Sequence, residues 1–367
     1  MAQIHGPDPW PRSMAQIHGP DPWPRHRVAT RRNAGSLGPV EPERPERWAR
    51  RATVPGLAPL DGPPLPAEYR PAVQSVPSGI VRPGVQLATQ KFYDVVECIA
   101  EGGMGRIYRA YDASMDRYVA LKLLKPDMPD YVRKRFRREA VIAANFSHPN
   151  LARVLDVGVV PGSGLEWMTM EYLRGRDLGR VVERARTIPL PLLVDIYSQT
   201  LDALDYIHTR KIIHCDIKPD NIFITRDTYD GRIVITKLID FGVSRSLETD
   251  EVPEQIAGDP LYMAPEQTVF RGEFDHRADL YALGMSFFET LTGRHPFQEH
   301  LTVPVEEHLR MQRECVPDPP SAWLPAGPRR QVDALDALFA KATAKDPRQR
   351  YADARAMRVA IRALLEA

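Results

Sequence analysis

The stretch from His214 to Asn221 constrains this chain more than any other part of its sequence. It reads His-Cys-Asp-Ile-Lys-Pro-Asp-Asn, which sets a carboxylate, a cation and an amide at fixed offsets as Asp216, Lys218 and Asn221. A second acidic motif, Asp240-Phe241-Gly242, follows. Phosphoryl transfer needs such a set: one carboxylate accepts a hydroxyl proton, a cation steadies the moving phosphate, and an amide with a second carboxylate holds Mg²⁺. A polar loop after a helix is the alternative for the first stretch alone, so the remaining motifs decide the interpretation.

A glycine-rich turn lies upstream, in Glu101-Gly102-Gly103-Met104-Gly105. Residues 93–99 before it and 106–111 after it have compositions typical of strands. Glycines let backbone N–H groups approach phosphates closely, because no Cβ intervenes. A strand rather than a helix follows the turn, which argues against the dinucleotide-binding fingerprint. We therefore interpret the turn as a lid over phosphates, with an ordinary hairpin turn as the alternative.

Another apolar strand is predicted at residues 118–124, and Lys122 stands inside it. A lysine among apolar residues is costly unless it has a partner. A basic amphipathic helix is predicted at residues 130–145, and Glu139 near its middle is the candidate partner. Taken singly, Lys122 would fit an edge lysine that extends to solvent, and Glu139 would fit a solvated helix face.

In this order, over residues 91–367, the motifs resemble those of the eukaryotic-like, bacterial-type serine/threonine protein kinase family. Met263-Ala264-Pro265-Glu266 is similar to the motif that closes the family's activation segment, and Asp279 opens a stretch that looks like the anchor helix of the large lobe. Arg350 is similar to the arginine that pairs with the Glu266 position. The resemblance implies an α+β, bilobal protein kinase fold, with an antiparallel-sheet small lobe (91–170), a hinge (171–175) and a mainly helical large lobe (176–367).

The resemblance also implies what the residues do. The chain would transfer the γ-phosphoryl group of ATP to Ser/Thr hydroxyls of protein substrates, in signal transduction, with ATP and Mg²⁺ as cofactors. Lysine at position 218 resembles Ser/Thr kinases rather than tyrosine kinases. The implied catalytic residues are Asp216, Lys218, Lys122 and Glu139, and the implied Mg²⁺ ligands are Asn221 and Asp240. The residues implied to bind ATP are Ile99, Gly102, Gly103, Met104, Gly105, Ile107, Ala120, Lys122, Met170, Glu171, Leu173 and Phe223.

Three residues depart from the family pattern. Ala100 replaces the first glycine of the turn, which an extended backbone tolerates. Cys215 replaces the arginine usual before the catalytic aspartate, so we expect no cation beside Asp216 to bind a phosphate on the activation segment. Cys215 itself is expected to be a small buried thiol, with a redox switch as the alternative. Asp259 replaces a threonine, and its carboxylate would repel Asp216 unless Lys218 compensates.

Two other functions stay open on these residues. The second is a pseudokinase, a scaffold that binds nucleotide without turnover, and Asp259 is its only support. A small-molecule phosphotransferase on a similar fold is the third reading. The Ala264-Pro265-Glu266 motif and the Asp279 helix argue against it, because in the family they build a peptide-docking surface.

Composition restricts partners and location. The formal net charge is +1, which gives no reason to expect nucleic acid or a membrane surface as a partner. The three cysteines have no metal-binding spacing and favour a reducing compartment. No run of 18 apolar residues occurs, and the last predicted helix, at residues 352–365, lies close to the end of the chain. We therefore expect a soluble, cytoplasmic protein; the oligomeric state is not indicated.

Residues 1–90 differ in kind from the rest. They hold 17 of the 35 prolines, 11 arginines and no lysine, with no apolar period. Such a segment cannot bury enough surface to offset its ordering entropy, so we expect a disordered tail. Residues 1–12 recur without change as residues 14–25, which favours a duplicated start over a functional repeat. A second polar segment, residues 225–236, is expected to be a hairpin without catalytic importance.

Overall fold

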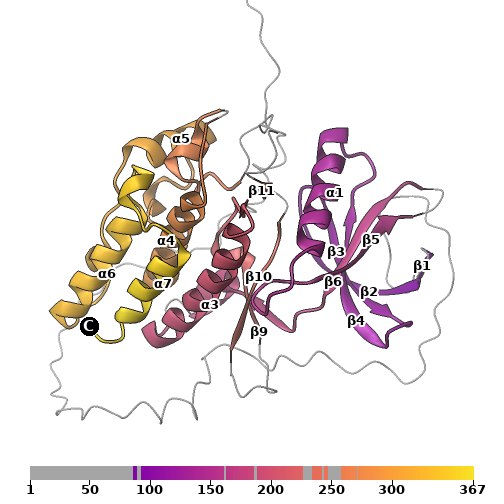
Figure 1. Cartoon of the computed structure of the whole chain (residues 1–367), viewed down its shortest axis with the longest axis horizontal. Coiled ribbons are helices and arrows are strands. Elements are labelled where there is room, and N and C mark those ends of the chain that lie inside the picture. The colour runs from indigo at the N-terminus through magenta and orange to yellow at the C-terminus, as the bar shows by residue number, and fades with distance from the viewer. Residues whose placement is uncertain are drawn as a thin grey trace, which may run out of the picture.

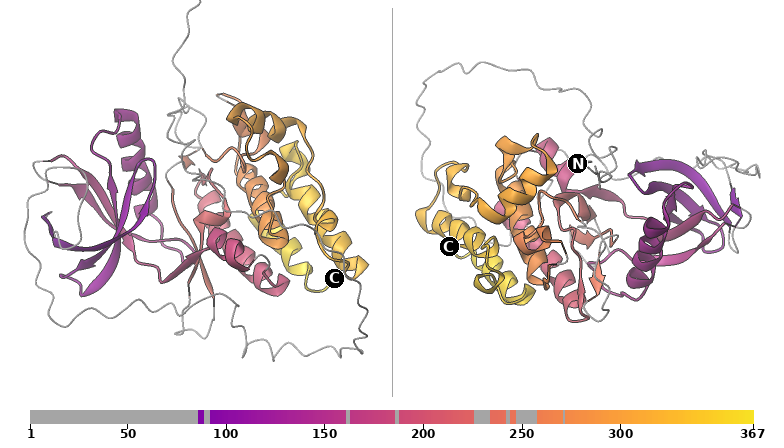
Figure 2. Two further views of the ribbon diagram at one scale, coloured as in Figure 1. Left: turned by 180° about the vertical axis from the view of Figure 1, so that it is seen from behind. Right: turned by 90° about the horizontal axis from the view of Figure 1, so that it is seen from above.

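The computed structural model describes residues 86–88, 92–160, 163–185, 188–225, 234–241, 244–246, 258–270 and 272–367. These residues form two lobes, a sheet with one helix and a helical body, joined by a narrow connection (Figure 1). The views from behind and from above in Figure 2 show the same division. This arrangement confirms the α+β, bilobal fold that the motifs predict.

The small lobe is built on a six-stranded sheet in the order β1-β2-β3-β4-β6-β5, in which each neighbouring pair is antiparallel. Its strands are β1 (Gln86–Ala88), β2 (Phe92–Glu101), β3 (Gly105–Asp112), β4 (Arg117–Leu124), β5 (Val154–Val159) and β6 (Glu166–Glu171). Strands β2, β3 and β4 contain the stretches predicted at residues 93–99, 106–111 and 118–124. The glycine-rich turn joins β2 to β3, as expected for a turn between two strands.

Helix α1 (Asp130–Ala144) covers one face of this sheet (Figure 1). Its buried residues Val132, Phe136, Glu139 and Ala143 recur at the three- and four-residue spacing of one helix face. Phe136 packs against Leu124 and Met168 of the sheet. Glu139 therefore points inward with the apolar residues, although its side chain is ionisable.

A second, three-stranded sheet joins the lobes. It has the order β10-β9-β7 and comprises β7 (Gly175–Asp177), β9 (Ile222–Thr225) and β10 (Ile235–Leu238). Strand β9 follows Asn221 directly, and β10 ends two residues before Asp240, so this sheet positions both motifs. β9 and β10 pair antiparallel, as expected for a hairpin; residues 226–233 between them lie outside the described part of the chain.

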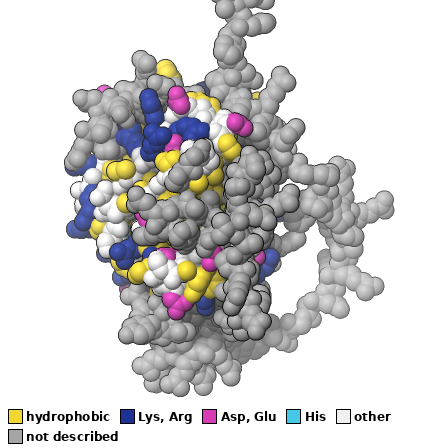
Figure 3. Space-filling model, turned by 90° about the vertical axis from the view of Figure 1, so that its right-hand side faces the viewer, with side chains coloured by type: hydrophobic (Ala, Val, Ile, Leu, Met, Phe, Trp, Pro, Cys, Tyr) yellow, Lys and Arg dark blue, Asp and Glu magenta, His cyan; other side chains and the backbone are white. Residues whose placement is uncertain are grey.

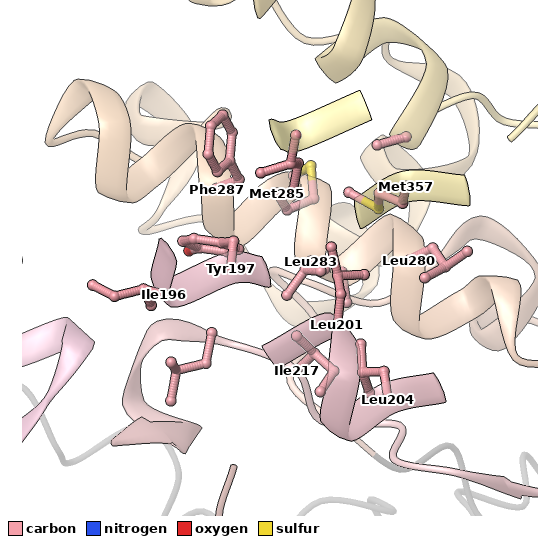
Figure 4. Packing of buried hydrophobic residues seen from close by; sticks show 14 of the residues in the cluster. Ile196, Tyr197, Leu201, Leu204, Ile217, Leu280, Leu283, Met285, Phe287 and Met357 are labelled. Atoms are coloured by element: carbon pink, nitrogen blue, oxygen red, sulfur yellow. The ribbon is translucent and has the colours of Figure 1, made fainter. Parts of the chain in front are cut away.

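The large lobe is mainly helical. Its helices are α2 (Leu178–Ala185), α3 (Leu190–His208), α4 (Arg277–Thr292), α5 (Val305–Glu314), α6 (Arg329–Ala342) and α7 (Ala354–Ala363), and β8 (Ile212–Ile213) pairs with β11 (Arg245–Ser246) beside them. Figure 4 shows the centre of its core, where side chains of α3 and α4, such as Leu201 and Leu283, face Met357 of α7. A Cβ on Gly284 would lie 2.8 Å from Cβ of Ala342, so α4 approaches α6 too closely for any larger residue.

Helix boundaries differ from the predictions by a few residues. The helix predicted at 192–209 spans Leu190–His208, and the one predicted at 352–365 spans Ala354–Ala363. The latter begins late because Asp353 caps it, accepting a hydrogen bond from the N–H of Ala356. One prediction is wrong: the composition of residues 1–90 predicts a disordered tail, but Gln86–Ala88 within it forms β1 at the edge of the sheet. Residues 1–85, with the repeat, lie outside the described residues.

The surface of the small lobe carries basic, acidic and apolar side chains intermixed, on the face that Figure 3 presents. Exposed apolar residues on its elements include Val141 of α1 and Val157 and Val159 of the edge strand β5. Among the helices that the structure describes, none has both the length and the apolar composition to cross a membrane.

Candidate active site

The loop that carries Asp216 is held by the first turn of α4. The buried carboxylate of Asp279 accepts hydrogen bonds from the backbone N–H groups of His214 (2.9 Å) and Cys215 (2.8 Å). Cys215 has a φ of 67°, a conformation that a non-glycine residue keeps only with support of this kind. Burial would raise the pKa of Asp279, but a hydrogen bond from His208 and further contacts lower it, so the group stays ionised.

Three donors surround the carboxylate of Asp216. Nδ2 of Asn221 donates to Oδ2 over 2.9 Å, and the backbone N–H of Asp259 donates to Oδ1 over 3.1 Å. Nζ of Lys218 lies 3.3 Å from Oδ2. Together they fix the orientation of the carboxylate, which a proton acceptor in a reaction requires. The set Asp216, Lys218 and Asn221 that the sequence indicated thus lies in one hydrogen-bonded group.

Asp259 does not oppose Asp216 without compensation. Its Oδ2 lies 3.2 Å from Nζ of Lys218, which therefore stands between the two carboxylates. Burial by itself lowers the pKa of Lys218, but the charges of Asp216 and Asp259 more than offset burial, and the pKa is raised. The compensation by Lys218, on which the prediction for Asp259 depended, is present.

Lys122 of β4 and Glu139 of α1 form the predicted pair. Nζ of Lys122 lies 2.7 Å from Oε1 of Glu139 and 3.4 Å from Oδ1 of Asp240. Burial lowers the pKa of Lys122, but Asp240 and Glu139 raise it further, so the ammonium form is favoured. The contacts bring the strand, the helix and the Asp240 motif to one point, and they leave Lys122 as a fixed cation between the lobes.

Asn221 and Asp240 lie on adjoining backbone segments, since the N–H of Ile239 donates to the carbonyl oxygen of Asn221 over 3.0 Å. The amide nitrogen of Asn221 is occupied by the oxygens of Asp216, which leaves its amide oxygen for a cation. Amide and carboxylate oxygens are the donors that Mg²⁺ prefers, so the pair fits that ion. Asp240 has a φ of 62°, and Phe241 after it is buried against His214, with ring centroids 4.9 Å apart.

The glycine-rich turn is open where a phosphate would approach. A Cβ on Gly102 or Gly103 would meet no atom of the described residues within 4 Å. Gly105 differs, because a Cβ there would lie 2.3 Å from the carbonyl oxygen of Leu123. Lys125 ties the turn to the end of β4, since its Nζ donates to the carbonyl oxygen of Gly102 over 2.9 Å. The turn is thus backbone-lined and anchored, as a phosphate lid needs to be.

The residues predicted to bind ATP come from both lobes. Ala120 of β4 pairs with Met170 of β6, and Glu171 follows at the end of that strand. Ile99 is 37% exposed, at the mouth of the turn, and Phe223 stands on β9 of the connecting sheet. The remaining members, Ile107 on β3, Met104 in the turn and Leu173 after β6, lie on the elements expected for them.

Glu266 and Arg350 form a two-pronged ion pair, with Nη1 and Nη2 of Arg350 lying 2.6 and 2.8 Å from the two carboxylate oxygens. The side chain of Arg350 is fully buried and also donates to three backbone carbonyl groups. The pairing that the resemblance implied is therefore present. It joins the segment after Met263 to the C-terminal part of the large lobe.

The absence of a phosphate-binding cation beside Asp216, which the replacement by Cys215 predicts, stays a prediction, because residues 247–257 of the activation segment lie outside the described residues. Among the described residues, the charges of Asp216 and Asp240 act on Arg135 of α1. The charge of Arg245 likewise acts on Cys215, and its guanidinium lies 4.7 Å from the ring centroid of Phe274. Burial raises the pKa of the Cys215 thiol well above its ordinary value, as expected for a small buried thiol.

Sequence reasoning missed a contact at the hinge. Nζ of Lys237, on β10, lies 2.8 Å from Oε1 of Glu171. The signal was available, because Lys237 stands in the apolar stretch Ile-Thr-Lys-Leu-Ile just as Lys122 stands in its strand. Nothing in the sequence pointed to Glu171 as its partner, since the two are 66 residues apart.

The family model described as "Protein kinase domain" matches residues 93–360. Serine/threonine-protein kinase pkn3 of Myxococcus xanthus is 36% identical over 282 residues, which cover 74% of this chain and 50% of that protein. Serine/threonine-protein kinase PknB of Mycolicibacterium smegmatis is 36% identical over 280 residues, covering 72% of this chain and 42% of that protein. The chain thus spans half or less of the length of these two relatives.

Solved structures give the same result for the fold. The crystal structure of the Mycobacterium tuberculosis PknI kinase domain superposes with a TM-score of 0.57 at 27% identity. The superposition covers 79% of this chain and all of that domain. The two lobes, and the elements that carry the candidate site, therefore have the arrangement of a solved bacterial kinase domain.

Proposed function

Because the chain belongs to the protein kinase domain family, we propose that it is an ATP-dependent serine/threonine protein kinase. One observation carries the proposal: Lys122, Glu139 and Asp240 meet at 2.7 and 3.4 Å, beside the hydrogen-bonded group of Asp216, Lys218 and Asn221. The bacterial relatives named serine/threonine-protein kinases support the choice of acceptor, as does lysine at position 218.

In the proposed reaction Asp216 accepts the proton of a substrate hydroxyl group. A bond forms between the hydroxyl oxygen and the γ-phosphorus, the bond from that phosphorus to the bridging oxygen breaks, and ADP leaves. Lys218 lies next to Asp216 and steadies the transferring group, while Lys122, fixed by Glu139, holds the α- and β-phosphates. Mg²⁺, when bound at Asn221 and Asp240, neutralises charge on the phosphates.

The chain's own contribution is positioning and charge stabilisation, because the transition state of phosphoryl transfer is loose. The backbone amides from Gly102 to Gly105 would cover the phosphates. Ile107 and Ala120 would hold adenine from one side and Phe223 from the other, and the backbone near Glu171 would hydrogen-bond to it.

The pseudokinase and the small-molecule phosphotransferase gain no support from these contacts. The argument for a pseudokinase depends on an uncompensated carboxylate at Asp259, and this carboxylate is paired with Lys218. The ion pair of Glu266 and Arg350 supports a protein substrate rather than a small molecule, since in the family it braces the peptide-docking surface. We further propose a cytoplasmic location, supported by the free thiols of Cys98, Cys215 and Cys315.

The experiment is a transfer assay with purified protein, Mg²⁺ and ATP labelled at the γ-phosphate, with and without a basic protein as acceptor. We expect label on serine or threonine. Asp216→Asn and Lys122→Met should each lower the rate by about 10²-fold or more, because each removes a group that acts in the transition state. Asp333→Asn, an exposed acid on α6, is the matched control and should keep the wild-type rate.

Wild-type rates in Asp216→Asn would exclude the proposed proton acceptor. Label found mainly on tyrosine would exclude serine/threonine specificity. Nucleotide binding without any transfer, by wild-type protein and variants alike, would establish a pseudokinase instead.

A further inference from the structure

The hinge residue Glu171 is bonded on two sides at once. Its backbone N–H donates to the carbonyl oxygen of Arg153 over 2.9 Å, and its Oε1 accepts from the backbone N–H of Arg153, also over 2.9 Å. The same Oε1 lies 2.8 Å from Nζ of Lys237. A residue at the end of β6 is thus fixed to the segment before β5 and to β10 of the connecting sheet.

Lys237 reaches this position from the strand that leads to Asp240. Its Nζ also lies 3.4 Å from the carbonyl oxygen of Leu151, so one ammonium group joins the hinge and a segment of the small lobe to β10. Backbone bonds reinforce the junction, because the N–H of Ala152 donates to the carbonyl oxygen of Leu238 over 2.9 Å. The ion pair of Lys237 and Glu171 therefore adds a side-chain contact where backbone hydrogen bonds already join β10 to the segment before β5.

The same ion pair lies beside the proposed adenine site. Lys237 is the direct cross-strand partner of Phe223, and directly opposed residues in an antiparallel pair project from the same face. Phe223 is proposed to contact the face of adenine, and the backbone at Glu171 is proposed to hydrogen-bond to adenine. The ion pair thus links Glu171 to Lys237, whose strand β10 pairs with the strand that carries Phe223.

The pair is sheltered enough to hold this geometry. The side chains of Lys237 and Glu171 are 16% and 29% exposed, so water and salt screen them less than a surface pair. Both bonds to Oε1 of Glu171 are charge-assisted, which makes them shorter and stronger than neutral hydrogen bonds. Exposed pairs such as Arg310 and Glu307 on α5 lack this shelter.

We propose that Lys237 and Glu171 form a clamp that sets the affinity for ATP by fixing the hinge against β10. The clamp rests on the proposed function, because it acts on the adenine site of a kinase. Lys237 and Glu171 are both positioning residues. Their side chains fix the hinge backbone at Glu171 against β10, the strand that pairs with Phe223, and neither side chain touches the transferring phosphate. Interactions that hold substrate and transition state equally change KM and not kcat, so the effect should lie in KM.

The test uses the full-length chain with Lys237→Met, which keeps the length of the side chain, Glu171→Gln, which keeps its shape, and the double variant. We expect each single change to raise the dissociation constant of Mg-ATP, measured by calorimetry without turnover, about fivefold. The double variant should be no worse than either single one, because the two changes break one interaction. KM should rise in parallel while kcat changes far less, and Lys237→Arg should restore most of the affinity.

Calorimetry tests the clamp independently of the proposed function, because it measures ATP binding whether or not phosphate is transferred. Unchanged ATP affinity in both single variants would overturn the clamp, as would strictly additive losses in the double variant. A lowered melting temperature with wild-type ATP affinity would show that the pair is only structural. Arg310→Met, which breaks an exposed pair, is the control and should leave ATP affinity unchanged.

Discussion

Nζ of Lys218 lies 3.2 Å from Oδ2 of Asp259. The same nitrogen lies 3.3 Å from Oδ2 of Asp216, so two carboxylates share one cation. Part of the positive charge that Lys218 offers to a transferring phosphate is therefore neutralised before any phosphate arrives. The family pattern has a neutral threonine at position 259, which would accept a hydrogen bond from Lys218 without adding a negative charge.

Replacement of Asp259 by threonine should raise kcat. The hydroxyl group keeps an acceptor near Lys218, and the lost negative charge leaves more of the lysine's charge for the transition state, so we expect an increase of about threefold. Initial rates at saturating ATP provide the measurement. Asp259→Leu removes the acceptor as well and should lower kcat about tenfold. A tenfold loss in the threonine variant would mean that the carboxylate charge itself is needed.

The ion pair of Glu266 and Arg350 should be a main source of large-lobe stability. Arg350→Met removes one partner of a buried pair and leaves a carboxylate without its cation, which costs about 3–5 kcal/mol. Urea denaturation should show a lower free energy of unfolding of that size. The double variant Glu266→Gln, Arg350→Met should recover part of the loss. If Arg350→Met lowered the free energy of unfolding by less than about 1 kcal/mol, the ion pair of Glu266 and Arg350 would contribute no more than an exposed surface pair.

Stability should depend on pH through Glu289. Burial raises its pKa from 4.5 to about 7, while a hydrogen bond from Tyr262 opposes the shift. An acid whose pKa is raised on folding adds stability below its unfolded pKa and loses that stability as the pH rises through the folded value. Between about pH 4.5 and 7, wild-type protein should lose stability relative to Glu289→Gln, which never ionises and keeps an acceptor for Tyr262.

The difference in unfolding free energy between Glu289→Gln and wild-type protein should reach on the order of 3 kcal/mol above pH 7 and vanish below pH 4.5. Thermal denaturation of the two proteins in parallel, at pH 5 and pH 8, measures it. Equal differences at both values would show that Glu289 is ionised in the folded protein throughout this range.

Removal of residues 1–85 should leave the melting temperature within a few degrees of wild type. The segment is rich in proline and has no apolar period, so it is expected to bury little surface. Removal of residues 1–90 takes away β1 as well, with its pairing from Gln86 to Ala88 against β2, and should lower the melting temperature further. A large drop in the shorter truncation would show that the tail packs against the lobes.

The sequence predicted the contacts that short motifs encode. Lys122 and Glu139 were identified because a charge among apolar residues needs a partner, and Asp216, Lys218 and Asn221 because they stand within one loop. Short strands such as β7 and β11 could not be found, because two or three residues carry no period.

Contacts that depend on how two segments pack against each other could also not be predicted from the sequence. Helix α1 contains five cations, and the sequence alone does not say which of them the charges of Asp216 and Asp240 act on, as they do on Arg135. The bond of Lys237 to Glu171 likewise forms only when the hinge reaches β10.

The last prediction separates two glycines of one turn. A Cβ on Gly105 would lie 2.3 Å from the backbone oxygen of Leu123, and backbone cannot move aside as a flexible side chain can. Gly105→Ala should therefore force β3 away from β4, lower the melting temperature by several degrees and weaken ATP binding more than tenfold. Gly103→Ala meets no described atom within 4 Å and should keep the wild-type melting temperature. Differential scanning calorimetry with and without Mg-ATP measures both effects. Equal melting temperatures of the two variants would show that the strands separate at Gly105 without cost, and that the glycine is needed only at the phosphates.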